Sequence, residues 1–179
     1  MAFVVFAGQS NTGGAFMNAS TLTQAWAPDP LILIWDTNTN AFVQMQPGVN
    51  TGYGQQPNAW GPEVAFARAF RAAHPDEVLQ IVKVAHGGTS LDLDSRQWVY
   101  DWSPQSVNEL FDEASAIIDA ASAAAGARPD ALFFGQGEED ATSPAMAADY
   151  EANLEDFFAQ ARADWLQDDG GKIGFFRIG

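Results

Sequence analysis

The sequence contains no cysteine, and this absence excludes several kinds of site. Disulfide bonds, zinc sites built on thiolates and cysteine nucleophiles all need a side chain that the chain lacks. The redox state of the compartment stays open.

Basic residues are scarce as well. Lysine and arginine number 8 against 23 aspartate and glutamate residues, which gives a formal net charge of -15. Phosphate backbones and anionic lipid surfaces would be repelled by such a chain, so we expect neither nucleic acid nor a membrane as partner. The acidic residues are spread along the sequence, which favours an acidic globular surface over a disordered tail.

Long hydrophobic runs are also missing. No apolar run approaches the roughly 20 residues that cross a bilayer. The apolar stretch at residues 2–7 follows Met1 without a basic region, so it is interpreted as a buried strand and not as a signal peptide. We expect a soluble protein; the sequence assigns no compartment, and an extracellular or virion-like assembly stays open.

The 179 residues, 47% of them hydrophobic, suffice for one core, and we interpret residues 1–179 as a single domain. Short apolar runs without strict alternation predict strands covered on both faces. These runs are residues 3–7, 31–35, 78–85, 131–134 and 172–178. A turn at 36–40 joins the second of them to a further extended segment at 42–45.

Three helical patterns lie between the predicted strands. Ser103-Pro104 and Ser143-Pro144 each place a capping serine before a proline, followed by apolar residues at helical spacing. A shorter helix is predicted from Gly61-Pro62. Strands that alternate with helices predict an α/β fold, a three-layer α/β/α sandwich around a five-stranded parallel, flavodoxin-like sheet, with ligands at the carboxyl ends of the strands.

Three of the predicted strands run into loops rich in glycine and small polar residues, at 8–14, 86–90 and 135–140. Parallel strands bring such loops to one rim of the sheet. A serine at a tight strand-to-helix turn is exposed to substrate, and glycines allow backbone N–H groups to approach a developing oxyanion.

The motifs on these loops resemble those of the sialate O-acetylesterase-like carbohydrate esterases, a branch of the SGNH hydrolases. Their order and spacing match the family over residues 2 to about 178. The matching motifs are Gly8-Gln9-Ser10-Asn11, Gly61-Pro62-Glu63, Lys83 followed by Gly87-Gly88-Thr89-Ser90-Leu91, and Gln136-Gly137-Glu138 with Asp140.

The resemblance implies an esterase that removes acetyl groups from O-acetylated sugars without a cofactor or metal. It makes Ser10 the nucleophile and implies oxyanion donors from the Ser10 N–H, the Gly87-Gly88 loop and the Gln136 amide. Residues around these positions are the expected substrate contacts. They are Gln9, Asn11, His86, Thr89, Glu138 and Asp140.

The sequence departs from the family in one respect. The family's base is a histidine in an Asp-x-x-His motif after the fifth strand, and no such motif occurs in these residues. Three explanations stay open: a further segment or subunit supplies the base and a last helix, the domain has become a non-catalytic carbohydrate-binding or appendage module such as those of phage-tail-like assemblies, or His86 replaces the base. His74 is expected at a surface helix terminus.

Several of these residues also have structural interpretations. Glu63 fits the positive end of a helix as well as a site role, and Lys83 fits a charge at a strand edge. The acidic cluster at 138–140 lacks the histidine pattern of a catalytic metal site, although calcium stays open. Trp98, Tyr100 and Trp102 fit a sugar-stacking wall, and core packing is favoured over it.

Overall fold

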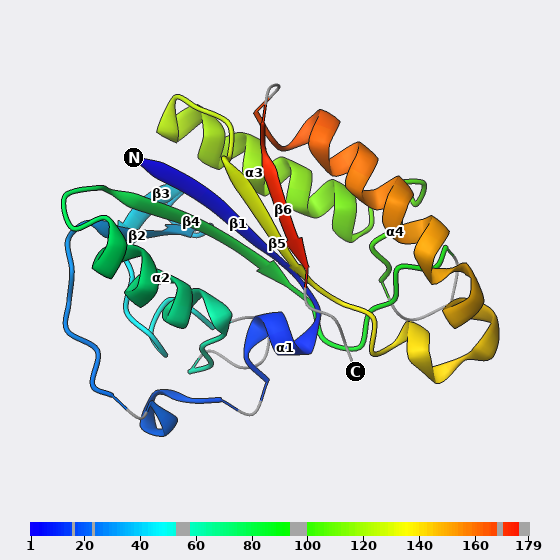
Figure 1. Cartoon of the computed structure of the whole chain (residues 1–179), viewed down its shortest axis with the longest axis horizontal. Helices are drawn as coiled ribbons and strands as arrows, with labels where there is room; N and C mark the ends of the chain where they lie inside the picture. The colour runs from blue at the N-terminus through cyan, green and yellow to red at the C-terminus, as the bar shows by residue number, and fades with distance from the viewer. Residues whose placement is uncertain (16, 23, 53–57, 94–99, 168–169, 176–179) are drawn as a thin grey trace.

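A six-stranded sheet forms the centre of the protein in the computed structural model, which describes residues 1–15, 17–22, 24–52, 58–93, 100–167 and 170–175. Its strand order is β3-β2-β4-β1-β5-β6 (Figure 1). Five strands run parallel, and β3 pairs antiparallel with β2 at one edge. The strands are β1 (Ala2–Gly8), β2 (Ile32–Asp36), β3 (Ala41–Gln44), β4 (Leu79–Ala85), β5 (Ala131–Gly135) and β6 (Lys172–Phe175).

Helices cover both faces of the sheet, as Figure 1 shows. On one face lie α1 (Ser10–Gly13) and α2 (Pro62–Ala73), and on the other lie α3 (Leu110–Ala125) and α4 (Pro144–Asp164). Two 3-10 turns, η1 (Ala19–Thr21) and η2 (Asp140–Thr142), belong to the connections. The three-layer α/β/α arrangement predicted from the sequence is confirmed.

Alternate residues of β1 serve two separate cores. Val4 and Phe6 pack with α2, whereas Phe3, Val5 and Ala7 pack with α3 and α4. Because successive side chains of a strand point to opposite faces, a strand covered on both faces must be apolar at every position. This explains why β1 has a continuous apolar run instead of an alternating pattern.

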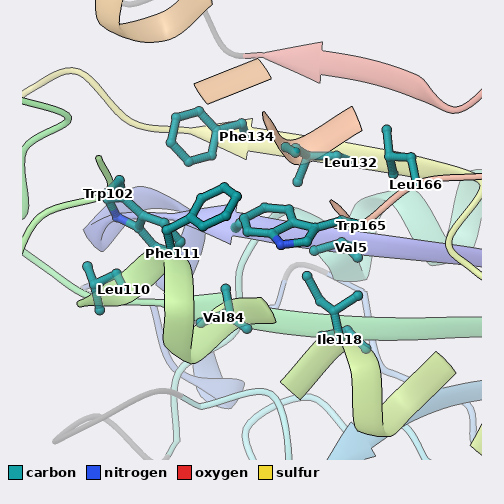
Figure 2. Packing of buried hydrophobic residues seen from close by; sticks show 14 of the residues in the cluster. Val5, Val84, Trp102, Leu110, Phe111, Ile118, Leu132, Phe134, Trp165 and Leu166 are labelled. Carbon is teal, nitrogen blue, oxygen red and sulfur yellow. The ribbon is translucent and has the colours of Figure 1, made fainter. Parts of the chain in front are cut away.

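The α3/α4 face is filled by a cluster of aromatic rings (Figure 2). Phe157 of α4 is fully buried and stacks on Phe134 of β5, with ring centroids 4.1 Å apart. Phe111 of α3 stacks on Trp165, and Trp102 meets Phe134 edge to face. Trp102 is completely buried, which confirms core packing for this residue. Core packing is wrong for Tyr100, which is 51% exposed, and Trp98 lies outside the described residues.

The strand count and strand order differ from the prediction. The segment after the 36–40 turn joins the sheet as β3, so the sheet has six strands where five were expected. Numbered along the chain, the parallel strands have the order 2-3-1-4-5, whereas the flavodoxin order is 2-1-3-4-5. The carboxyl ends of β4, β1 and β5 are therefore direct neighbours.

Helix α3 begins later than Ser103-Pro104 predicts. The Asp101 carboxylate accepts hydrogen bonds from the Ser103 N–H and the Ser106 hydroxyl, which folds this segment into turns. Asn108 then adopts the left-handed conformation, with a φ of 61°, and interrupts any helix there. The helix starts at Leu110, and the Ser143-Pro144 and Gly61-Pro62 starts are confirmed.

None of the helices in the described part of the chain has the length and apolar character needed to span a membrane.

Candidate active site

The three glycine-rich loops leave the sheet at the same level. Gly8 at the end of β1 pairs with Ala85 of β4 on one side and with Gly135 of β5 on the other. Two hydrogen bonds continue this pairing into the loops, from the His86 N–H to the Gly8 carbonyl at 3.0 Å and from the Gln9 N–H to the Gly135 carbonyl at 2.9 Å. The loops that follow the three strands therefore begin side by side.

Gly8 allows the chain to turn out of the sheet at this point. Its φ is 142°, and a Cβ placed on it would lie 2.1 Å from the Gly135 carbonyl oxygen. Only glycine accommodates both the conformation and the close approach. The next residues form the single helical turn α1, which starts at Ser10.

Ser10 is partly exposed at the start of this turn. Because the first N–H groups of a helix have no partner within it, the N–H groups of Ser10 and Asn11 are not used inside α1. A partly exposed hydroxyl beside such N–H groups is an arrangement suited to acyl transfer.

Glu138 holds the residues on either side of Ser10. One of its carboxylate oxygens accepts from the Gln9 side-chain amide and the other from the Asn11 side-chain amide. A single carboxylate on the β5 loop thus fixes the position of the β1 loop before and after the serine.

The loop after β4 is held by residues of the β5 loop. The Gln136 amide nitrogen donates to the Thr89 carbonyl at 3.0 Å and to the Asp140 carboxylate. Asp140 in turn accepts from the backbone N–H groups of Leu91 and Asp92. This network fixes the segment that carries Gly87 and Gly88.

Burial raises the pKa of Asp140 above its ordinary value, while the hydrogen bonds from Gln136 and from the Leu91 and Asp92 amides act in the opposite direction. Burial likewise raises the pKa of Tyr150, whose hydroxyl donates to the Gln136 carbonyl at 2.8 Å. Tyr150 is therefore a neutral donor that fixes the backbone of the β5 loop.

Several predicted site residues are buried. The exposed fraction is 2% for Gln9, 0% for Thr89, 3% for Gln136 and 1% for Asp140. The Thr89 hydroxyl donates to the His86 carbonyl and accepts from the Trp102 indole N–H. These side chains contact neighbouring loops, whereas the predicted substrate contacts that reach the surface are Asn11, His86 and Glu138.

The Gln136 amide has a different environment from that expected of an oxyanion donor. Both of its N–H groups are engaged, by Thr89 and Asp140, and its carbonyl oxygen is buried and has no hydrogen-bond partner among the described residues. Reversing the amide would place its oxygen against two acceptors, so the present orientation is the favoured one. Donation to an oxyanion requires one of the two bonds to be released.

The loop at Gly87-Gly88 is open to solvent. Gly88 is exposed, adopts the left-handed conformation with a φ of 73°, and has no atom of the described residues within 4 Å of a Cβ placed on it. Among the described residues, nothing therefore crowds this glycine as the Gly135 carbonyl crowds Gly8.

A buried ion pair lies beneath the Ser10 turn. Lys83 of β4 and Glu63 of α2 are 3.0 Å apart, with side-chain exposures of 3% and 0%. Because β4 lies between β2 and β1, the interpretation of Lys83 as a strand-edge charge is wrong. Sequence reasoning missed the pair because the partners are far apart in sequence and only the strand order brings them together.

The two histidines lie in separate places. His74 caps the carboxyl end of α2 on the surface, 3.2 Å from Glu77, as expected. His86 is exposed beside the loop, and its ring packs edge to face with that of Tyr100 at 5.6 Å. In the described part of the chain, no hydrogen bond joins either histidine to the Ser10 hydroxyl.

The acidic cluster at 138–140 does not converge on one point. Glu138 faces the β1 loop, and Asp140 faces the segment at 91–92. Among the described residues, no group of three histidine, aspartate or glutamate side chains is arranged to hold a metal ion.

Comparison with known families assigns the chain to a family of enzymes. The model of a family described as carbohydrate esterase, sialic acid-specific acetylesterase, matches residues 1–169. The chain belongs to this family. Its members are carbohydrate esterases, and the residues gathered at the β1, β4 and β5 loops lie within the matched region.

Three solved structures share the fold of this chain. A protein of Arabidopsis thaliana has a TM-score of 0.67 at 21% identity, over 91% of this chain and 68% of that one. A carbohydrate acetylesterase from Xanthomonas citri has a TM-score of 0.62 at 17% identity, over 97% of this chain and 40% of that one. NanS has a TM-score of 0.59 at 15% identity, over 97% of this chain and 66% of that one. No curated protein matches the chain in sequence.

Proposed function

We propose that the protein containing this chain hydrolyses O-acetyl groups on carbohydrates through an acyl-enzyme intermediate on Ser10. The observation that carries the proposal is that three glycine-rich loops leave the sheet side by side, and that one of them carries a partly exposed serine at the start of a helical turn. Family membership supports the ester chemistry, and the acetylated sugar is the substrate class that the family description names.

In the proposed reaction the Ser10 oxygen attacks the acetyl carbonyl carbon and gives its proton to a base. The tetrahedral oxyanion accepts hydrogen bonds from the Ser10 N–H and from the Gly87-Gly88 loop, and its collapse releases the sugar hydroxyl. Water then attacks the acetyl-serine and releases acetate. Each oxyanion donor contributes about 3 kcal/mol of transition-state stabilisation in comparable enzymes.

The base is proposed to come from a further segment or subunit. Serine is a weak nucleophile without an adjacent base, and the described residues offer no histidine bonded to its hydroxyl. The solved relatives are longer than the part that this chain matches. On this proposal the 179 residues alone have little or no activity.

The proposal is tested by the Ser10→Ala substitution in the complete protein. Hydrolysis of an aryl acetate should fall by about 10⁴-fold or more, because the covalent step is lost while the fold is unchanged. Ser20→Ala, at an exposed serine of η1, is the matched control and should keep wild-type turnover.

Turnover retained by Ser10→Ala would remove Ser10 from the mechanism. An intact protein that is inert toward acetyl esters, yet binds acetylated glycans equally well with serine or alanine at position 10, would favour the alternative of a carbohydrate-binding or appendage domain.

A further inference from the structure

The buried Lys83–Glu63 pair is an unusual feature for the interior of this sheet. Burying two opposite charges costs more free energy than the attraction returns unless their remaining hydrogen-bonding groups are satisfied, and apolar residues of similar volume are often as stable. Stability alone therefore gives little reason for an ion pair at this position. The partners of the pair indicate another reason.

Lys83 binds the carbonyl at the end of the Ser10 turn. Its ammonium donates to the Gly13 carbonyl at 3.1 Å, to the Thr51 carbonyl at 2.8 Å and to the Glu63 carboxylate at 3.0 Å. The same Glu63 oxygen accepts from the Gly61 N–H at 2.8 Å. The pair thus joins β4, the start of α2 and the end of α1.

Backbone contacts also pack the end of α1 against the start of α2. A Cβ on Gly14 would lie 1.9 Å from the Trp60 carbonyl oxygen, and one on Gly61 would lie 2.4 Å from the Thr12 carbonyl oxygen. The segments 12–14 and 60–61 therefore touch through their backbones. Any shift of the Glu63 end of α2 would move α1 with it.

The Ser10 turn cannot hold its own position. It contains four residues, and an isolated helical turn of this length is unstable. Its conformation depends on bonds from outside, and Lys83 provides a charged donor to its last carbonyl. An apolar side chain at position 83 could fill the space but could not bind that carbonyl.

We propose that the Lys83–Glu63 pair is a positioning device that sets the location of the Ser10 hydroxyl relative to the Gly87-Gly88 loop. Lys83 and Glu63 are positioning residues, since they act through Gly13 and Gly61 without touching substrate. The proposal rests on the proposed function, in which Ser10 is the nucleophile.

The test compares kcat and KM for an aryl acetate in the complete protein. Lys83→Met should lower kcat by about 10- to 10²-fold, because a small displacement of a reacting group has effects of this size. KM should change by less than about twofold, since no substrate contact is lost. Glu63→Gln should shift kcat in the same direction.

Arg71→Met is the matched control. Arg71 forms an ion pair with Asp29 at 2.7 Å near the opposite end of α2, so its loss removes an ion pair of the same helix without contact to α1. This variant should keep the wild-type kcat. A loss of kcat equal to that of Lys83→Met would mean that general destabilisation of α2 explains the effect, and would overturn the proposal.

Hydrogen–deuterium exchange gives a second measurement that does not depend on Lys83→Met folding. In Glu63→Gln the N–H groups of Gly13 and Ala15, which bond to the Gln9 and Ser10 carbonyls, should exchange about tenfold faster, whereas those of β1 stay unchanged. A uniform increase across the sheet, or none at Gly13 and Ala15, would overturn the proposal.

The two proposals fail in different ways. Wild-type kcat in Lys83→Met and Glu63→Gln, beside an inactive Ser10→Ala, would overturn the positioning role alone. Activity retained by Ser10→Ala would overturn both.

Discussion

At the scale of single residues, glycines in left-handed or related conformations differ in what surrounds them. Gly8 and Gly126 both have positive φ values, but a Cβ on Gly8 meets the Gly135 carbonyl, whereas one on Gly126 has no atom of the described residues within 4 Å. Gly8→Ala should therefore lower the free energy of unfolding by about 3 kcal/mol, from strain and overlap together.

Gly126→Ala is the matched control. It should lower the free energy of unfolding by only about 1 kcal/mol, because alanine is strained in this backbone conformation. Urea unfolding of both variants measures the difference. Equal losses would contradict the close β1–β5 contact that turns the chain toward Ser10.

The side-by-side position of the three polar loops could be predicted from the sequence, but the contacts between them could not. Glycine and polar residues after three strands indicated the rim correctly. Which side chains are buried there depends on partners far along the chain, such as Trp102 for Thr89 and Glu138 for Gln9. The hydrogen bonds that Trp102 donates to Thr89 and Tyr150 donates to Gln136 had no local signal, since both donors lie outside the glycine-rich loops.

At the scale of elements, Asp140 anchors the loop after β4. Asp140→Asn should lower the free energy of unfolding by about 1–3 kcal/mol, because the new amide group places a donor against the Gln136 or Leu91 N–H. Asp149→Asn, on the exposed side of α4, should change stability by less than about 0.5 kcal/mol. Chemical denaturation at neutral pH checks both values; equal effects would contradict the anchoring role.

The raised pKa of Asp140 predicts how this difference varies with pH. Between the ordinary value of 3.8 and the raised value, the folded protein keeps a proton that the unfolded chain releases. The stability contributed by Asp140 is therefore greatest below this window and is lost as the pH rises through the folded pKa. The free energy of unfolding of the wild type should exceed that of Asp140→Asn by more at about pH 4 than at about pH 7.

Unfolding curves of both proteins at the two pH values test this sign. A difference that grows with rising pH would mean that hydrogen bonding to the charged carboxylate, and not burial, dominates its pKa.

The start of α3 shows why helix boundaries are difficult to predict from sequence. Ser103-Pro104 has the residue types of a helix start, yet the Asp101 side chain captures the same N–H and hydroxyl groups for a turn. Side chains that bond to nearby backbone compete with helix formation. Ser143-Pro144 has no such competitor among its described contacts, and there the prediction is confirmed.

At the scale of the whole molecule, the layer between the sheet and α3/α4 depends on Phe157. This ring is fully buried and contacts the rings of Phe134, Phe111 and Trp165. Phe157→Ala should lower the free energy of unfolding by about 3–5 kcal/mol. Val107→Ala, at a residue that is 77% exposed, should change the free energy of unfolding by less than about 0.5 kcal/mol. Thermal unfolding of the two variants measures the difference.

The class of fold could be predicted because it depends on local patterns, and the sheet order could not. The five apolar runs of the sequence correspond to the five parallel strands of the sheet, and their bounds were predicted approximately. The order 2-3-1-4-5 depends on which strands pair over long distances, and this order makes Lys83 an interior residue. The last predicted strand extends to residue 178, and its residues beyond Phe175 lie outside the described part of the chain.

We propose that the β1, β4 and β5 loops together present Ser10 as a nucleophile. The most direct measurement treats the complete protein with a fluorophosphonate, which reacts with activated serines, and maps the modified peptide by mass spectrometry. One adduct is expected, on Ser10, and hydrolysis of an aryl acetate should be lost in proportion to labelling. An active esterase whose adduct forms on another residue, with Ser10 unmodified, would contradict it.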